Sequence, residues 1–259
     1  MVRKSSSPTQ EGPASVAHRC CTEEQLAILR WTAGLGAVTA EALAHRGGLT
    51  LASARSRLAS AERAGMLRRS RLLAAAPALY TATPAGLRAC GARGFQPCRV
   101  SVANAPHAIA CAAAAAALER AYPDHRLMGE PELRHDEREA GAALASAQVG
   151  EGPRGAQLLH RPDLVLWPDG PHELLPVAIE VELTVKAPQR LLAICMAWAR
   201  CRCVAGTVYL AAAGVQRPLA RAIERAGANE RIALVPVDVV AVAQEGAKRA
   251  LARSIPGAA

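Results

Sequence analysis

Charged residues recur with the spacing of strand residues in the C-terminal half of the sequence. Glu180, Glu182, Thr184 and Lys186 occupy alternate positions, so an extended chain points them to one side and apolar residues to the other. Two carboxylates two residues apart on a strand face lie about 7 Å apart, and their repulsion has to be offset. A solvated face would offset it. Asp163, in the preceding apolar segment, would instead complete an acidic cluster able to hold a hard cation such as Mg²⁺.

The order of these residues resembles the core of the PD-(D/E)XK nucleases. Pro162-Asp163, a hairpin and then Glu180-Val-Glu182 follow one another as in that motif. The resemblance implies that Asp163 and Glu180 bind the metal and that a lysine two positions after Glu180 orients the attacking water. Glu182 occupies that lysine position here, and Lys186 could take the role. The catalytic residues implied are Asp163, Glu180, Glu182 and Lys186.

The elements expected to position these residues alternate between strands and helices. Antiparallel strands followed by helix–strand alternation predict an α/β or α+β domain. The expected helices are His107–Ala121, Pro188–Arg202 and Pro218–Ala226. Gly129–Arg134 is expected to be the start of a strand. The further expected strands are Arg161–Trp167, Leu175–Val185, Gly206–Ala212 and Ile232–Val237. Residues 138–158 show no clear period and are expected to form a loop, and Pro168–His172 a turn.

Positive charge is concentrated in the N-terminal third of the chain. The whole protein has 259 residues and a formal net charge of +9, and residues 19–97 carry eleven arginines against four glutamates. Such an excess is expected of a segment that contacts a phosphate backbone. A generic basic surface is the alternative that composition leaves open.

The same segment has the element order of a winged helix-turn-helix domain. A capping box at Thr22–Gln25 begins a first helix, Ala40–Arg46 and Leu51–Ala64 form two more, Met66–Tyr80 has the pattern of a basic hairpin, and Thr83 caps a closing helix. The stretch from Glu62 through the hairpin to Ala89 is similar to the recognition helix, wing and post-wing helix of many bacterial regulators.

The third helix is predicted to face DNA with its polar side. Leu51, Ala54, Leu58 and Ala61 share the core face. Small hydroxyls flanked by guanidinium groups suit a helix against a DNA groove. A solvated face of a partner-binding domain is the alternative. The predicted DNA-binding residues are Ser53, Arg55, Ser56, Arg57, Ser60 and Arg63 on the helix, with Arg68, Arg69 and Arg71 on the hairpin.

Composition excludes several classes of protein. No apolar run reaches the length of a membrane span, and the polar N-terminus lacks a signal core, so we expect a cytoplasmic protein without membrane contact. Eight cysteines are too sparse for a disulfide scaffold. No P-loop or nucleophile elbow is present. A zinc cluster of Cys195, Cys201 and Cys203 with His172 has an unconvincing spacing, and His107 is expected to pack against its helix.

The whole layout resembles the replication-relaxation family of plasmids and mobile elements. The landmarks are His107, Glu130, Glu132–Arg134, Pro162-Asp163, Glu180–Thr184 and Lys186. Membership implies DNA binding in plasmid replication or its control. The expected organisation is a disordered tail (1–19), a winged helix-turn-helix domain (20–97), a PD-(D/E)XK nuclease-like, restriction-endonuclease-like domain (98–245) and a C-terminal tail (246–259), giving an α+β fold.

Three functions stay open at this point. The first is a regulator that binds duplex DNA through the winged helix and uses the nuclease-like domain as an accessory. The second is a Mg²⁺-dependent DNA endonuclease, and the third is a protein–protein adaptor without DNA binding. The oligomeric state is open, with a homodimer as one arrangement.

Overall fold

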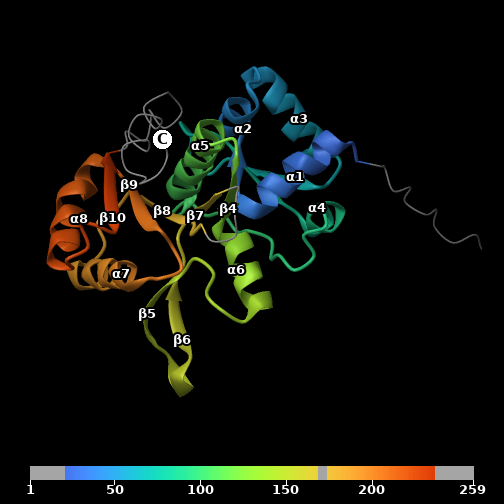
Figure 1. Ribbon diagram of the computed structural model, residues 1–259. Coiled ribbons are helices and arrows are strands. Elements are labelled where there is room, and N and C mark those ends of the chain that lie inside the picture. Colours follow the sequence, from blue (N-terminus) through green and yellow to red (C-terminus); the bar gives the residue numbers. More distant parts are fainter. Residues whose placement is uncertain (1–20, 169–173, 237–259) are drawn as a thin grey trace, which may run out of the picture.

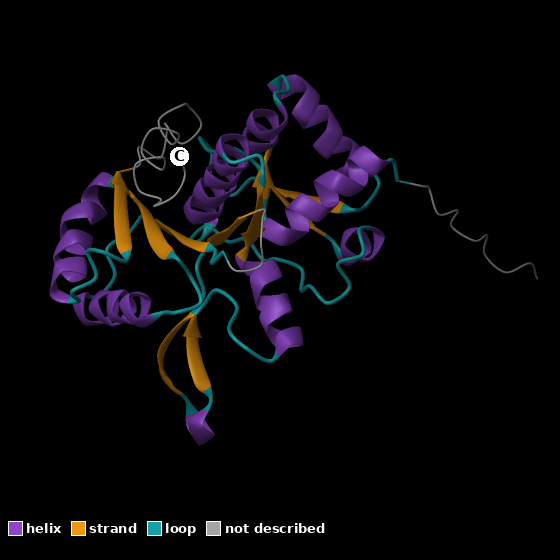
Figure 2. Cartoon of the chain, viewed as in Figure 1, coloured by secondary structure: helices purple, strands orange, loops and turns teal. Residues whose placement is uncertain are grey.

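The computed structural model describes residues 21–168 and 174–236 of the chain, which form a mixed α+β fold (Figures 1 and 2). The predicted tails at 1–19 and 246–259, the end of the nuclease-like segment from residue 237, and most of the predicted turn, with His172, lie outside the described residues. No helix in the described part of the chain combines the length and apolar character needed to cross a membrane.

The N-terminal elements build a three-stranded antiparallel sheet covered by helices. The strand order is β1-β3-β2, with Val38 opposite Tyr80 and Arg69 opposite the same tyrosine. The elements are α1 (Glu23–Leu35), β1 (Val38–Thr39), α2 (Ala40–Gly47), α3 (Leu51–Arg63), β2 (Leu67–Ser70), β3 (Leu79–Ala82) and α4 (Pro84–Ala89).

Local sequence signals set the ends of these helices. The Thr22 hydroxyl accepts from the Gln25 N–H, and the Gln25 side chain accepts from the Thr22 N–H, so the predicted capping box is confirmed. Thr50 caps α3, and Gly65 follows its end with a φ of +73°, a left-handed conformation that costs glycine little. The predicted helix phase is also confirmed, because Ala54, Leu58 and Ala61 are buried.

The C-terminal elements build a mixed five-stranded sheet of order β10-β9-β8-β7-β4. Strands β8, β9 and β10 are parallel, and β7 is antiparallel to both β8 and β4. The elements are α5 (Ala105–Ala121), β4 (His125–Gly129), α6 (Glu130–Ala140), β5 (Ala147–Glu151), η1 (Pro153–Gly155), β6 (Gln157–His160), β7 (Leu164–Pro168), β8 (Val177–Glu182), α7 (Pro188–Arg200), β9 (Gly206–Ala211), α8 (Ala213–Arg225) and β10 (Ile232–Pro236).

Helices cover both faces of this sheet. Ala114, Ala115 and Leu118 of α5 are buried in one cluster with the sheet residues Ile179 and Val181. On the opposite face, α7 and α8 supply Trp198 and Leu219, which pack with Tyr209 of β9. This arrangement puts successive side chains of β8 into different layers of the molecule.

Helix α5 also belongs to the N-terminal core. Ala112 and Ala116, on its other side, are buried together with Leu29, Leu43 and Leu58. Alanine at these positions allows close packing on both sides of one helix, which explains the alanine-rich composition of this segment. The predicted boundary between residues 97 and 98 therefore precedes a helix whose side chains are shared between two cores.

Two sequence predictions for the segment 129–158 were wrong. Gly129–Arg134 was expected to start a strand, but Gly129 is the last residue of β4 and the rest of the segment belongs to α6, which begins at Glu130. Pro131 lies in the first turn of this helix, and Gly141 follows its end in the left-handed conformation. Residues 138–158 were expected to form a loop, but they contain the end of α6, all of β5 and the first half of β6. A register shift between Gln148 and Gly150 breaks the alternation by which this hairpin could have been detected.

Two predicted boundaries were also wrong. Strand β8 was expected to extend to Val185, but it ends at Glu182, opposite the last residue of β9, Ala211. Helix α8 begins at Ala213, so Pro218 lies inside the helix and does not start it.

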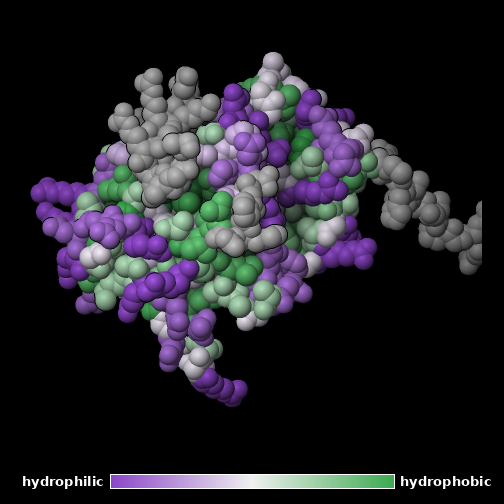
Figure 3. All heavy atoms as spheres, in the orientation of Figure 1, coloured by the Kyte–Doolittle hydropathy of each residue, from purple (hydrophilic) through white to green (hydrophobic). Residues whose placement is uncertain are grey.

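The surface reflects this arrangement. The β5–β6 hairpin projects from the body of the molecule (Figure 1), and hydrophilic atoms cover its tip and the outer side of α8, while hydrophobic atoms gather near the centre of the face shown (Figure 3).

Candidate functional site

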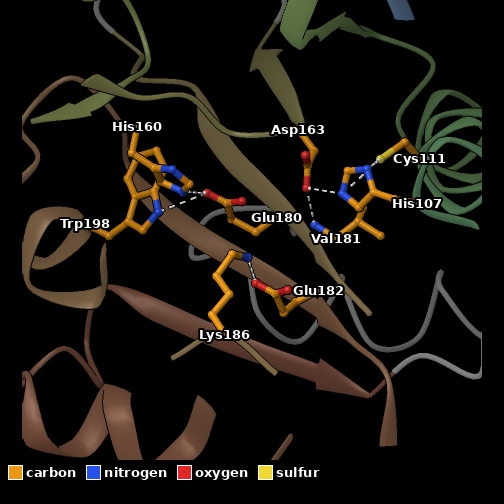
Figure 4. Close-up of polar contacts among 9 residues, drawn as sticks. All are labelled: His107, Cys111, His160, Asp163, Glu180, Val181, Glu182, Lys186 and Trp198. Atoms are coloured by element: carbon orange, nitrogen blue, oxygen red, sulfur yellow. Dashed lines mark hydrogen bonds and ion pairs between the residues drawn. The ribbon is translucent and has the colours of Figure 1, made fainter. Parts of the chain in front are cut away.

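Asp163 is held by main-chain contacts at the start of β7. Its carbonyl accepts the Glu130 N–H at 3.1 Å, and its Oδ2 accepts the Val181 N–H at 2.7 Å. Since Leu164 pairs with Ile179, the register of the two strands brings Asp163 and Glu180 to the same end of the hairpin. The sequence placed these two residues together correctly, although their side chains then turn toward different helices (Figure 4).

Glu180 lies on the face of β8 that α7 covers. It is 4% exposed, and its Oε1 accepts the indole N–H of Trp198 at 3.1 Å. The same oxygen is 2.8 Å from Nε2 of His160, at the end of β6 (Figure 4). Burial raises the pKa of Glu180 above its ordinary value, and the His160 contact opposes part of that rise. Neither His160 nor Trp198 was predicted, because no local pattern links them to β8.

Glu182, the last residue of β8, forms an ion pair with Lys186. Glu182 is 4% exposed, and the Lys186 ammonium returns to its Oε2 from the loop before α7 (Figure 4). Burial lowers the pKa of Lys186, while the nearby carboxylates of Glu180 and Asp163 oppose that shift. Lys186 is therefore close to the carboxylates, as expected if it replaces a lysine two positions after Glu180, but its direct partner is Glu182.

The side chain of Asp163 turns toward α5, where it meets a histidine that was expected only to pack. Nε2 of His107 lies 3.3 Å from Oδ2 of Asp163. Cys111, one turn further along α5, has its Sγ 3.6 Å from Nδ1 of His107. The hydrogen-bonding contact with Asp163 raises the pKa of His107, and burial raises that of Cys111.

The three predicted carboxylates thus have three different partners. Asp163 contacts His107 and the Val181 amide, Glu180 contacts His160 and Trp198, and Glu182 contacts Lys186 (Figure 4). Within the described residues, a set of three ligand-type side chains with all ligand atoms within 4.8 Å of one another is formed by His107, Cys111 and Asp163. The i, i+4 spacing of His107 and Cys111 was visible in the sequence, but its link to Asp163 was not.

The predicted DNA-binding residues lie on α3 and on the β2–β3 hairpin. Arg55, Ser56, Arg63, Arg68, Arg69 and Arg71 are exposed, and Ser53, Arg57 and Ser60 are half-buried. A groove of about 540 Å³ separates helix and hairpin, with Arg55, Arg69 and Arg71 among its lining residues. Arg55 also pairs with Glu41 at 3.2 Å, and Arg57 pairs with Glu24.

The cysteines at the end of α7 do not extend the site. Sγ of Cys201 lies 3.2 Å from Sγ of Cys203, and both thiols approach the carbonyl of Ser146. The hydrogen bond from Cys203 lowers the pKa of Cys201 to about 6. Cys195 is buried beside Glu180, and burial raises its pKa to about 11.

Comparison of the chain with protein-family models, with curated proteins and with solved structures found no match.

Proposed function

We propose that residues 21–97 bind duplex DNA as a winged helix-turn-helix domain. The order α1-β1-α2-α3-β2-β3, with three strands in one antiparallel sheet, supports this assignment. Helix α3 then takes the position of the recognition helix, and the β2–β3 hairpin that of the wing.

The observation that carries the proposal is the arginine-lined groove between α3 and the hairpin. Arg55 enters it from the helix, and Arg69 and Arg71 enter it from the hairpin. In the described residues, no carboxylate lies within 4 Å of the guanidinium groups of Arg68, Arg69 or Arg71. The unpaired guanidinium groups on the hairpin wall and the exposed Arg55 on the helix wall are suited to phosphates on the two sides of a DNA groove.

The two ion pairs of α3 are compatible with this role. The Arg55 side chain is 61% exposed in its pair with Glu41. Exposed pairs of this kind contribute about 0–1 kcal/mol, so a phosphate can replace the glutamate at little cost. Glu41 and Glu24 then act as competitors of the DNA backbone and set how tightly non-specific DNA is held.

The direct test is the triple variant Arg68→Ala/Arg69→Ala/Arg71→Ala. Duplex affinity, measured by fluorescence anisotropy over a range of salt concentrations, should fall, and the salt slope should flatten by about 0.9 for each phosphate that the variant no longer neutralises. The matched control replaces Arg126, Arg134 and Arg138, which are also exposed but lie on β4 and α6. Equal affinity and slope for the wild-type protein and the hairpin variant would leave the adaptor function as the better account.

For the whole chain, the proposal is a DNA-binding protein of plasmid or mobile-element replication or its regulation, in which the C-terminal part is a nuclease-like accessory domain. Its support is the hairpin β7–β8, which carries Asp163 and Glu180, followed by α7 and the parallel strand β9. This is the arrangement expected from the resemblance to PD-(D/E)XK nucleases, although Glu182 occupies the usual lysine position. Duplex DNA is the proposed partner.

A second candidate, a Mg²⁺-dependent endonuclease, is favoured by the surroundings of Lys186. This lysine lines a groove of about 410 Å³ between α7 and α8, together with Arg217, Arg221 and Arg225. The groove offers cationic side chains to a nucleic acid strand next to the carboxylates.

Two carboxylate oxygens remain available to a hard cation. Oδ1 of Asp163 and Oε2 of Glu180 accept no hydrogen bond from the described residues, and carboxylate oxygens are ligands that Mg²⁺ prefers, so rotation of Asp163 toward Glu180 would offer it both. When bound, the ion would activate a water and stabilise charge on a phosphate. Lys186, released from Glu182, would position that phosphate or water.

Plasmid cleavage separates the two candidates. A nuclease should cut plasmid DNA only with Mg²⁺ or Mn²⁺, and Glu180→Gln should abolish cutting but leave duplex binding unchanged. A regulator with an accessory domain should bind DNA and leave it uncut with either metal. Glu139→Gln removes the charge of an exposed side chain on α6 and is the matched control.

A further inference from the structure

Helix α5 and the start of β7 bring together three side chains, of which only Asp163 takes part in the functions proposed above. His107 and Cys111 are separated by four residues, so they lie one above the other on the same face of α5. Asp163 faces them from the sheet, and the Val181 N–H, 2.7 Å from its Oδ2, fixes the orientation of its carboxylate. Three different metal-binding groups, imidazole, thiol and carboxylate, therefore meet at one point.

The two distances from His107 to the other ligand atoms are close to those around a tetrahedral zinc ion. Bond lengths of about 2.0–2.1 Å to nitrogen, about 2.0–2.2 Å to oxygen and about 2.3 Å to sulfur give separations of about 3.4 Å between nitrogen and oxygen and about 3.6 Å between nitrogen and sulfur in a regular tetrahedron. Nε2 of His107 is 3.3 Å from Oδ2 of Asp163 and 3.8 Å from Sγ of Cys111. One ligand atom from each of the three side chains lies within 4.8 Å of those of the other two.

The contact between His107 and Asp163 is longer than a strong hydrogen bond between charged groups. A charge-assisted contact between an imidazolium and a carboxylate has a length of about 2.7–2.9 Å, whereas the His107–Asp163 separation is 3.3 Å. By contrast, the histidine that contacts Glu180 lies at 2.8 Å, the length of such a bond. The His107–Asp163 separation is therefore longer than that of a charge-assisted hydrogen bond and close to that of two ligands of one ion.

We propose that His107, Cys111 and Asp163 bind a zinc ion through three protein ligands and leave a fourth position open to solvent. The sulfur and nitrogen ligands select zinc over Mg²⁺, which prefers oxygen alone. The His107 side chain is 43% exposed, so the described residues leave room beside it for a water or an exchangeable ligand. Three protein ligands and an open position are the pattern of reactive zinc sites.

Asp163 links this site to the candidate Mg²⁺ position. The carboxylate of Asp163 would be a ligand both in the Mg²⁺ site, with Glu180, and in the zinc site, with His107 and Cys111. Occupation by zinc orients Asp163 toward α5 and away from Glu180, so zinc should oppose Mg²⁺ binding. The inference goes beyond the proposed DNA binding and does not depend on it, because the ligands lie outside residues 21–97.

Cobalt substitution tests the proposal on the full chain. Metal-free protein is titrated with Co²⁺, and the absorption spectrum is followed for a thiolate-to-cobalt charge-transfer band and for the visible bands of a tetrahedral ion. We expect both, and we expect Zn²⁺ to displace Co²⁺ with loss of the bands. Cys111→Ser should abolish the charge-transfer band, and His107→Ala should lower the Zn²⁺ affinity, measured by competition with a chromophoric chelator, by more than about tenfold.

Control variants separate this site from other thiols. Cys21→Ser changes a partly buried cysteine of the N-terminal part, and Cys203→Ser changes the thiol pair at the end of α7. Both should retain the band, and circular dichroism should show native folding of every variant. Absence of the band from the wild-type protein, or its loss in Cys203→Ser and retention in Cys111→Ser, would overturn the proposal. Glu180→Gln should bind Zn²⁺ as tightly as the wild-type protein does.

Discussion

Trp198 donates its indole N–H to the same oxygen of Glu180 that lies 2.8 Å from Nε2 of His160. The carboxylate of Glu180 is therefore buried with two hydrogen-bonding partners on one oxygen. Burial disfavours the charged form and raises the pKa of Glu180. This relationship makes Glu180 a residue whose effect on stability depends on pH.

We expect Glu180→Gln to change the pH dependence of stability in a defined direction. A carboxyl group whose pKa is raised on folding holds its proton more tightly in the folded state. Its contribution to the free energy of unfolding is fully present below the ordinary value of 4.5 and is lost as the pH rises through the folded pKa. Glutamine keeps the acceptor but does not titrate, so the variant should gain stability relative to the wild-type protein as the pH rises above about 4.5.

Urea unfolding between acidic and neutral pH measures this effect. The exposed Glu139, replaced by glutamine, serves as the control and should show a nearly constant difference from the wild-type protein. A constant difference for Glu180→Gln, or a loss of relative stability with rising pH, would contradict the raised pKa.

The two sides of α3 should respond differently to truncation. Leu58 is fully buried, whereas Ser56, two positions earlier, is exposed. Leu58→Ala should reduce the free energy of unfolding by about 2–5 kcal/mol because it removes buried apolar surface and leaves a cavity. Ser56→Ala should change it by no more than about 0.5 kcal/mol. Denaturant titration of both variants measures these two losses of stability. A larger loss for Ser56→Ala than for Leu58→Ala would contradict the prediction and would also remove Ser56 from the proposed DNA-facing side.

Removal of the glutamate that competes for Arg55 should strengthen DNA binding. Glu41→Gln frees a guanidinium that lies 3.2 Å from the carboxylate and lines the groove beside the hairpin. Duplex affinity should rise, and the salt slope should steepen by about 0.9 if Arg55 gains one phosphate. The charge-matched control Glu139→Gln should change neither by a comparable amount. Weaker binding in Glu41→Gln would show that Glu41 positions Arg55 for DNA.

The predictable parts of the fold are those in which local periodicity matches burial. The phase of α3 followed from Leu58 and its helical neighbours, and the alternation of β8 followed from Ile179 and Val181, which are buried on the α5 side. In both elements, one face is apolar and continuous. The periodicity of the sequence therefore also identified which polar residues lie on the other face.

The segment before β7 escaped prediction for two physical reasons. Helix α6 has Glu130 and Glu132 in its first turn and Arg138 in its last, which favour a helix, but its polar composition hid the buried Leu133. The β5–β6 hairpin is exposed over much of its length, and its bulge interrupts the period.

Long-range contacts at the site were also invisible in the sequence. His107 and Asp163 meet only because α5 packs on the sheet beside β7, and His160 reaches Glu180 only because β6 ends next to β8. The pairing of Asp163 with Glu180 was predictable because both residues lie on one hairpin. Contacts between elements distant in the sequence depend on packing, which single-sequence patterns do not encode.

Removal of one partner of the Glu182–Lys186 ion pair should lower the free energy of unfolding far more than removal of one partner of an exposed ion pair. Glu182 is 4% exposed, and Lys186→Met would leave its carboxylate buried without a counter-charge. We expect a decrease of about 3–5 kcal/mol in the free energy of unfolding for this variant. Arg30→Met breaks a pair whose side chains are 54% and 80% exposed, and it should cost at most about 1 kcal/mol.

The double variant Glu182→Gln/Lys186→Met tests whether this decrease comes from the isolated charge. Because glutamine removes the buried carboxylate, the double variant should recover most of the stability that Lys186→Met loses, and a double-mutant cycle measured by urea unfolding should give a coupling of at least about 1 kcal/mol. If Lys186→Met were as mild as Arg30→Met, Lys186 would not be held by Glu182 in solution. Its ammonium would then be free for the phosphate or water of the endonuclease candidate, and plasmid cleavage by Lys186→Met would test that role directly.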